Sequence, residues 1–219
     1  MEKEDHKKKE MLDSVYFNNK VHGEDNALRH ILKAMSVVDR KYFVRKEEAF
    51  KAYEDFPLPI GYGQTISQPS TVARMLLLSD IKKGMNILDI GSGSGWNACL
   101  LAYLAYPGKV ISVEILPELS DFAINNFNRL KIQGFVKSMN IEFLKGSVFS
   151  HEDLMKEKFD LIIAAAGADP LLIEKLKEFD FKRLVVPTSS GDMEVWKKKG
   201  KKISLELREK GYAFVPLIR

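Results

Sequence analysis

Apolar and polar residues alternate along this chain in blocks that predict strands and helices in turn. Short apolar runs rich in β-branched residues are typical of buried strands, and longer stretches with apolar positions three or four apart are typical of amphipathic helices. The pattern predicts strands at 85–90, 109–114, 140–144, 158–165 and 183–187, and helices at 26–35, 69–77, 98–106, 119–130 and 169–178. Because strand–helix–strand units cross over with one hand, this order predicts an α/β fold with a doubly wound, mostly parallel sheet.

Both ends of the chain depart from this alternation. Residues 1–25 are charge-dense and are expected to form a solvated, partly helical leader, which leaves 26–219 as a single domain. Extended stretches near 193–198, 203–208 and 212–217 predict antiparallel strands at the end of the sheet.

The turn after the strand at 85–90 carries the first chemical signal. A buried strand ends with Asp89 and Ile90, and Gly91, Gly93 and Gly95 follow at alternate positions. Glycines let a ligand approach the main chain closely, and the following helix directs its free N–H groups toward the same point. The spacing lacks the Gly-Lys-Ser/Thr ending of a phosphate-binding loop. The turn therefore predicts a small polar ligand, with a glycine-rich turn that binds nothing as the alternative.

The next strand ends in a second acidic residue, Glu114, about twenty residues after the glycines. From that position a carboxylate reaches a ribose diol in Rossmann-like folds. Glu114 is therefore a candidate for binding a ribose. The alternative is that it caps the helix that begins at Pro117.

The segment 53–69 precedes the first predicted strand of the sheet. Its three prolines and two glycines exclude an interior helix and disfavour a long strand, yet it is apolar and aromatic. A loop of this composition is expected to cover a site. Ser67 or Ser70 is predicted to cap the helix that follows.

Composition narrows the class of protein. The chain has 219 residues, of which 45% are hydrophobic, and a net charge of +4. These values fit a soluble globular domain and do not imply a nucleic-acid partner. No apolar run approaches the roughly 18 residues that span a bilayer, and the N-terminus lacks an apolar signal segment, so a cytoplasmic location is expected. The single cysteine, Cys99, excludes an intrachain disulfide and is predicted to be a core residue, and no metal site is predicted.

Two segments together resemble one enzyme family. The pattern hydrophobic-Asp-hydrophobic-Gly-x-Gly-x-Gly at 88–95 resembles motif I of the S-adenosylmethionine (SAM)-dependent methyltransferases. The upstream run Asp-x-Pro-Leu-Pro-Ile-Gly-x-Gly-Gln-Thr-Ile-Ser-x-Pro at 55–69 resembles the protein-L-isoaspartate O-methyltransferases. The resemblance implies a Rossmann-like methyltransferase fold and methyl transfer from SAM to the free carboxylate of L-isoaspartyl residues, with D-aspartyl residues as further substrates. Such methylation initiates the repair of damaged proteins.

The resemblance implies a cofactor site around the glycine turn. The turn amides would receive the methionine carboxylate of SAM, Asp89 its ammonium group and Glu114 its ribose, with Ile115 beside the adenine. The candidate cofactor-binding residues are Gln64, Thr65, Ile66, Asp89, Gly91, Ser92, Gly93, Gly95, Glu114, Ile115, Ser147 and Val148.

The resemblance also implies that Ser67 is the catalytic residue, with its hydroxyl donating to the acceptor carboxylate. That carboxylate, with a reference pKa of about 4, is already ionised at neutral pH and needs no strong base. Small residues at 164–168 leave room for a peptide and remove the aromatic platform on which amino-group DNA methylases stack a flipped base. The candidate substrate-binding residues are Asp55, Pro57, Ile60, Ala165, Ala166, Val215, Pro216 and Leu217. The expected partners are isoaspartyl peptides and proteins rather than nucleic acid or membrane, and a monomer is favoured.

Three positions depart from the family pattern. Ser147 stands where the family usually has an acid, Phe181-Lys182 where it has two glycines, and Thr188–Ser190 where it has a glycine after the strand. The turns there are expected to be built differently. The alternatives are an RNA or small-molecule methyltransferase on the same fold, and a diverged, non-catalytic member that binds peptides.

Overall fold

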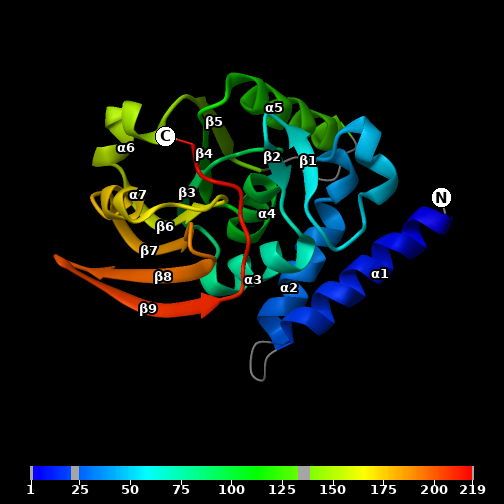
Figure 1. The fold of residues 1–219 in the computed structure, drawn as a ribbon, viewed down its shortest axis with the longest axis horizontal. Coiled ribbons are helices and arrows are strands. Elements are labelled where there is room, and N and C mark those ends of the chain that lie inside the picture. The colour runs from blue at the N-terminus through cyan, green and yellow to red at the C-terminus, as the bar shows by residue number, and fades with distance from the viewer. Residues whose placement is uncertain (1, 21–24, 133–138, 219) are drawn as a thin grey trace.

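A computed structural model describes residues 2–20, 25–132 and 139–218 (Figure 1). The helices are α1 (Glu2–Asn19), α2 (Asp25–Val37), α3 (Pro69–Ser79), α4 (Trp96–Ala105), α5 (Pro117–Ile132), α6 (Glu152–Lys156) and α7 (Pro170–Leu176), with 3-10 turns η1 (Arg40–Tyr42), η2 (Lys46–Lys51) and η3 (Val148–Ser150). The strands are β1 (Leu58–Gly61), β2 (Gln64–Ile66), β3 (Asn86–Ile90), β4 (Lys109–Glu114), β5 (Ile141–Lys145), β6 (Lys158–Ala164), β7 (Asp180–Pro187), β8 (Asp192–Lys199) and β9 (Lys202–Lys210).

The main sheet has seven strands in the order β5-β4-β3-β6-β7-β8-β9. The pairs from β5 to β7 are parallel, and β8 and β9 are antiparallel. The chain starts in the middle, at β3, winds outward to β5, and returns through β6 to β7. This arrangement confirms the doubly wound α/β sheet that the apolar pattern predicts, and it brings the carboxyl ends of five parallel strands to one edge.

Two apolar layers cover the sheet because successive side chains of a strand point to opposite faces. On one face Ile87, Val110 and Leu161 pack in a cluster with residues of α2, α3, α4 and α5. On the other face Leu88, Ile162 and Leu184 pack in a cluster with residues of η3, α6 and α7. Phe181, predicted to belong to a turn, instead lies inside β7 and is buried in the second cluster.

The described part of the N-terminal leader differs from the expected solvated segment. Residues 2–19 form α1, which runs beside α2 in Figure 1 and contacts α2 and α3. Met11 and Val15 are 2% and 0% exposed, and Asn19 donates from Nδ2 to the carbonyl oxygens of Val15 and Ser70. Apolar residues four apart share one face of a helix, and that face is enough to attach a helix whose first nine residues, Glu2–Glu10, are all polar or charged.

Asp55 caps the N-terminus of α3, a role predicted for Ser67 or Ser70. The N-cap residue is Gln68, and it makes no side-chain capping bond. Asp55 instead accepts from the Ser70 backbone N–H at 2.8 Å and from the Ser70 hydroxyl at 2.5 Å, and from Asn18 Nδ2 at 3.0 Å. A carboxylate at this end of a helix satisfies a free N–H group and interacts favourably with the helix dipole. It also ties α1 to the segment that the sequence predicts to be a lid.

The stretch 212–217 is not the predicted third antiparallel strand. It crosses from β9 toward the end of β4 (red in Figure 1), and its pairing with the sheet is an isolated parallel bridge between Gly167 and Pro216. The Gly167 N–H donates to the Val215 carbonyl at 2.8 Å, and the Leu217 N–H donates to the Gly167 carbonyl at 2.9 Å. We call residues 212–218 the C-terminal strap. The turn before β8 is built on Thr188, whose hydroxyl bonds to Ser190 and accepts from the Asp192 N–H.

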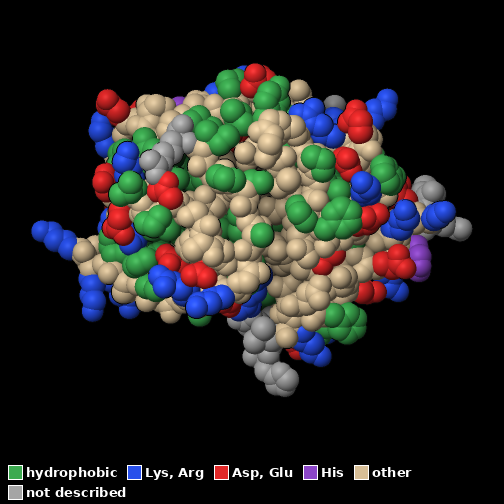
Figure 2. Space-filling model, in the orientation of Figure 1, with side chains coloured by type: hydrophobic (Ala, Val, Ile, Leu, Met, Phe, Trp, Pro, Cys, Tyr) green, Lys and Arg blue, Asp and Glu red, His purple; other side chains and the backbone are tan. Residues whose placement is uncertain are grey.

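Acidic and basic side chains are interspersed around the rim of the face shown in Figure 2, and the middle of that face shows mostly hydrophobic side chains, other side chains and backbone. Within the described residues, no helix combines the length and the apolar character that crossing a membrane requires.

Replacing the Asp55 cap with Asp55→Ala is expected to lower the free energy of unfolding by about 1–2 kcal/mol, because the Ser70 N–H and hydroxyl lose their acceptor. Urea denaturation measures the change. Asp13→Ala, at an exposed position of α1, is the matched control and should stay within about 0.5 kcal/mol of the wild type. Equal stabilities for the two variants would contradict the capping role.

Candidate active site

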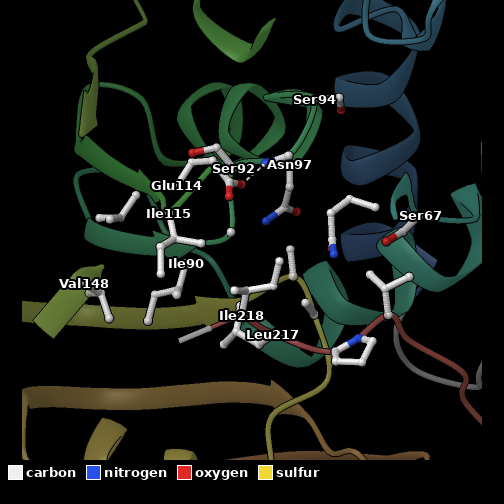
Figure 3. Close-up of a pocket in the computed structure, with 18 of the residues that line it drawn as sticks. Ser67, Ile90, Ser92, Ser94, Asn97, Glu114, Ile115, Val148, Leu217 and Ile218 are labelled. Carbon is white, nitrogen blue, oxygen red and sulfur yellow. Dashed lines mark hydrogen bonds between the residues drawn. The ribbon is translucent and has the colours of Figure 1, made fainter. Parts of the chain in front are cut away.

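A cavity opens over the carboxyl edge of the parallel strands (Figure 3). Its wall combines residues 64–67 of the predicted lid, the glycine turn, the end of β4, residues 146–149, the end of β6 and the C-terminal strap. Of the sequence-predicted site residues, those that line it are Gln64, Thr65, Ile66, Ser67, Gly91, Ser92, Gly93, Glu114, Ile115, Ser147, Val148, Ala165, Ala166, Val215, Pro216 and Leu217. Segments far apart in the sequence therefore meet at one place.

Five predicted site residues are not part of the cavity wall. Asp55 caps α3, and Asp89 is buried beneath the glycine turn. Gly95 is the N-cap of α4, Pro57 directly precedes β1, and Ile60 lies within the hairpin formed by β1 and β2. Ile60 is fully buried. We call β1, β2 and their connecting turn the lid hairpin.

Each glycine of the turn faces a different part of the chain. A Cβ at Gly95 would lie 3.1 Å from the Ala123 Cβ of α5, and a Cβ at Gly93 would lie 3.3 Å from the Ile60 Cδ1 of the lid hairpin. A Cβ at Gly91 would lie 3.5 Å from the Leu217 Cδ1 of the strap. Gly93 and Gly95 also have φ angles of +51° and +84°, which favour glycine. The turn is therefore the point against which α5, the lid hairpin and the strap are all packed.

Most of the turn's N–H groups already have acceptors within the protein. Those of Gly91 and Ser92 donate to the Val113 carbonyl, and that of Gly95 donates to the Ser92 carbonyl. The Gly93 N–H donates to Glu114 Oε2 at 2.8 Å. These bonds do not match the prediction that the turn amides receive a carboxylate of the ligand. Four of the turn's N–H groups are therefore engaged, and side chains on the wall are the further donors to such a group.

Asp89 lies beneath the turn as the acceptor of a buried network. It is 0% exposed, and it accepts from Asn97 Nδ2 at 2.7 Å and from the Ser112 hydroxyl at 2.7 Å. Because Ser112 donates its single hydroxyl hydrogen to Asp89, the Ser92 hydroxyl 2.6 Å away must donate to Ser112. Ser92 therefore presents only lone pairs to the cavity. The Asp89 charge reaches the wall through Ser92 and Asn97, and not directly.

Burial raises the pKa of Asp89 to about 6, while the hydrogen bonds from Ser112 and Asn97 act in the opposite direction. At neutral pH the carboxylate is ionised. Both of its neighbours are then held as donors, which fixes the Asn97 amide with its nitrogen toward Asp89. The sequence-based prediction did not include Asn97, although its place in the first turn of α4 puts it next to the glycines.

Glu114 is the carboxylate of the cavity wall, and its main chain belongs to the end of β4. Its Oε2 accepts from the Gly93 N–H at 2.8 Å and its Oε1 from the Leu116 N–H at 3.1 Å. Each oxygen keeps a second lone pair, so the group can still accept from two neighbouring hydroxyls. Figure 3 shows Glu114 and Ile115 on the same side of the cavity.

Ser67 lies across the cavity from Glu114, after the end of β2, with its hydroxyl directed into the cavity in Figure 3. Its carbonyl accepts from Arg40 Nη2 at 3.1 Å. The neighbouring wall residues Gln64 and Thr65 add an amide and a hydroxyl. The lid segment therefore supplies neutral donors to the cavity.

Two apolar surfaces complete the site. Ile90, Ile115 and Val148 lie close to one another and to the strap residues Leu217 and Ile218 in Figure 3. Ser147 begins the 3-10 turn η3, where its carbonyl accepts from Ser150. A flat apolar group fits between such surfaces, and its polar edge would meet the Ser147 hydroxyl.

The arrangement suits a ligand with hydroxyls, a cationic group and a flat apolar ring. One carboxylate, a serine acceptor and several neutral donors surround apolar walls, as in cofactor sites. The described residues contain no group of three His, Cys, Asp or Glu side chains that could hold a metal ion.

The sequence is similar to one family over nearly its whole length. A sequence model of the family described as protein-L-isoaspartate(D-aspartate) O-methyltransferase matches residues 8–219. A protein named protein-L-isoaspartate O-methyltransferase from Methanopyrus kandleri is 39% identical over 196 residues, which cover 86% of this chain and 83% of the relative. One of the same name from Pyrococcus abyssi is 40% identical over 182 residues, 78% of this chain and 79% of the relative. For the namesake from Aeropyrum pernix the identity is 40% over 169 residues, 76% of this chain and 63% of the relative.

Solved structures show the same fold. A Plasmodium falciparum protein described as a protein-L-isoaspartate O-methyltransferase, crystallised with S-adenosyl-L-homocysteine, superposes with a TM-score of 0.79 at 22% identity over 96% of this chain and 98% of that one. A second protein-L-isoaspartate O-methyltransferase structure superposes with a TM-score of 0.73 at 23% identity over 95% of this chain and 65% of that one.

The raised pKa of Asp89 gives a pH dependence that can be measured. Its ordinary value is about 3.9, so between about pH 4 and 6 the native state holds more protons than the unfolded state. The stabilisation from this group is complete below about pH 4 and is lost as the pH rises through 6. The difference in free energy of unfolding between the wild type and Asp89→Asn should therefore fall by roughly 3 kcal/mol from pH 4 to 7.

Asp160→Asn serves as the control of opposite sign. Partial burial acts to raise the pKa of Asp160, but hydrogen bonds from Lys182 and the Asn86 N–H lower it below its usual range. The stabilisation from Asp160 should therefore be present above about pH 4 and be lost in acid. A wild-type minus Asp89→Asn difference that is flat from pH 4 to 7 would rule out the assigned shift.

Proposed function

Because the chain belongs to the protein-L-isoaspartate(D-aspartate) O-methyltransferase family, we propose that its cavity binds SAM beside an isoaspartyl carboxylate and transfers the methyl group to that carboxylate. Family membership confirms the resemblance drawn from the two sequence segments. The observation that carries the proposal is that these two segments and the end of β4 line one cavity, with Glu114 on one side and Ser67 on the other.

The polar wall fits the parts of SAM. Glu114 would accept from the two ribose hydroxyls, and the Ser92 lone pairs would face the ammonium group, with the Asp89 charge behind them. Because the turn N–H groups are engaged, we assign the methionine carboxylate to neutral donors of the wall, Gln64 and Thr65. The adenine would lie between Ile115, Val148 and the strap, with the Ser147 hydroxyl at its edge. When bound, SAM supplies an electrophilic methyl group on a sulfonium sulfur.

The chain's own residues would bind and orient the acceptor. A carboxylate with a reference pKa of about 4 is ionised at neutral pH, so the site has to align one of its oxygens with the methyl carbon and exclude water. The Ser67 hydroxyl would donate to this carboxylate and hold it in place. The oxygen forms a bond to the methyl carbon as the carbon–sulfur bond breaks, and the electron pair passes to sulfur. The products are a methyl ester and a neutral thioether, and no proton has to move.

The acceptor end suits a peptide better than a nucleic-acid base. Ala165 and Ala166 line the cavity with small side chains and provide no surface on which a base could stack. The strap residues Val215 and Pro216 lie beside them on the wall. Proteins and peptides that carry isoaspartyl residues are therefore the proposed partners, with D-aspartyl residues as further substrates. We also propose that the protein acts as a monomer in the cytoplasm and that this methylation begins the repair of damaged proteins.

The reaction can be tested with labelled SAM and a pair of peptides that differ only in an isoaspartyl or a normal aspartyl linkage. We expect label in a base-labile ester of the isoaspartyl peptide and background label in its twin. An added RNA should remain unlabelled. Equal labelling of both peptides would refute the proposed specificity. SAM binding by calorimetry without labelling of either peptide would leave a protein that binds the cofactor for a different reaction.

The role of Ser67 can be tested with Ser67→Ala. Losing one hydrogen bond to a charged acceptor should lower kcat/KM for the isoaspartyl peptide about 10- to 100-fold, because the acceptor is no longer held in line. Affinity for S-adenosyl-L-homocysteine should change less than about threefold. Ser204→Ala, at an exposed position of β9, is the matched control with full activity. Full activity of Ser67→Ala would remove the assignment.

A further inference from the structure

Arg40 is a fully buried cation that binds the main chain of the lid. It lies in η1, directly after Asp39, which caps that turn, and its side chain is 0% exposed. Its Nη1 donates to the carbonyl oxygens of Ala52 at 2.9 Å and Glu54 at 3.3 Å. Its Nη2 donates to those of Phe56 at 3.0 Å and Ser67 at 3.1 Å. Four carbonyls of one segment thus converge on one guanidinium.

The two acceptors of Nη2 stand at the two ends of the lid hairpin. Phe56 precedes β1 and Ser67 follows β2, so a single nitrogen joins the chain entering the hairpin to the chain leaving it. Between them, Ile60 rests against Gly93 of the glycine turn. Arg45 Nε donates to the Ile60 carbonyl and its guanidinium lies over the Phe122 ring of α5. The hairpin is held at its base by Arg40 and farther out by Arg45.

Arg40 also contacts the wall on the cofactor side of the cavity. Its guanidinium carbon lies 5.5 Å from the centre of the Trp96 ring, within the range of a cation–π interaction. Trp96 lines the cavity, directly follows Gly95, and donates from Nε1 to the Val38 carbonyl at 2.9 Å. One side chain therefore connects the lid main chain to the first residue of α4.

The cost of burying the Arg40 charge favours the lid conformation in which its carbonyl acceptors are in place. A buried charge is costly unless its donors are paired, and burial lowers the pKa of Arg40 to about 9, with the Asp55 charge acting in the opposite direction. The pairing is supplied by carbonyl dipoles of the lid, so a displaced lid base would leave the cation without acceptors. A lysine has three donors on one nitrogen and lacks the planar fork that can span these four carbonyls.

We infer that Arg40 is a positioning residue for the transfer reaction. It fixes the base of the lid hairpin, and through the Ser67 carbonyl it sets where the Ser67 hydroxyl stands in the cavity. Arg40 does not touch the substrate, and its effect passes through the main chain of residues 52–67. The expected effect of Arg40 on methyl transfer rests on the proposed function. Its expected effect on the position of the lid hairpin does not.

The test compares Arg40→Lys with Arg183→Lys, a matched control whose Nη1 binds the Leu78 carbonyl near the C-terminal end of α3 and whose Nη2 pairs with Glu206. Hydrogen exchange of the β1 and β2 amides should accelerate about tenfold or more in Arg40→Lys, while exchange in β3 and β6 stays as in the wild type. The KM for the isoaspartyl peptide should rise or its kcat fall at least tenfold. Affinity for S-adenosyl-L-homocysteine should fall as well, because Gln64 and Thr65 of β2 are the residues assigned to its carboxylate. Arg183→Lys should match the wild type in all three measurements.

Other outcomes overturn the inference. Exchange that accelerates equally in β1, β3 and β6 would make Arg40 a general stabilising residue. Unchanged exchange in β1 and β2 would show that Arg40 does not fix the base of the lid hairpin. Arg40→Gln, which keeps one side-chain amide without the charge, is the second variant, and failure of both variants to fold would also refute a positioning role. Hydrogen exchange does not depend on methyl transfer. If the wild type fails to label isoaspartyl peptides, the proposed function falls and the exchange result still decides the role of Arg40.

Discussion

The structure depends on the close approach of three segments to one glycine turn. At Gly91, Gly93 and Gly95 the absence of a side chain lets the C-terminal strap, the lid hairpin and α5 come within van der Waals distance of the same few main-chain atoms. A methyl group at Gly95 would meet the main chain of α5, which has no room to move away. The cavity is the space that remains where these segments do not touch, so its shape follows from the turn.

The same crowding decides how charge is distributed in the site. The turn N–H groups are used to hold the turn together, and Asp89 is sealed beneath it with Ser112 and Asn97 as donors. Among the described residues that line the cavity, Glu114 is the one carboxylate, and the Asp89 charge acts on the cavity through Ser92. A cationic, hydroxyl-bearing cofactor meets preoriented acceptors there, and an ionised carboxylate on the opposite side meets neutral donors. That division of the wall suits transfer of a methyl group from a sulfonium to a carboxylate.

Most residues that depart from the family pattern lie away from the cavity wall. Phe181 extends β7 and fills the core, and Thr188 rebuilds the following turn with its own hydroxyl. Ser147 alone among them lies on the cavity wall. At that position the wall carries a serine in place of the family's acid, while the lid and the glycine turn keep the residues on which the family resemblance is based. Arg40 connects the lid to the start of α4, through the Phe56 and Ser67 carbonyls on one side and the Trp96 ring on the other.

The sequence by itself determined the doubly wound, mostly parallel sheet, because alternating strand and helix blocks joined by right-handed crossovers leave that as the compact arrangement. It also determined the family, because the runs at 55–69 and 88–95 are specific. It singled out Ser67 and Glu114, and both line one cavity. Tertiary structure alone decided which polar groups remained available to bind a ligand in the cavity. Asp55 and Asp89 match the motifs, but the free N–H of α3 and the donors beneath the turn take up their oxygens. The roles of Arg40 and Asn97 were also decided by tertiary structure, since their partners are main-chain carbonyls and a carboxylate brought near by the fold.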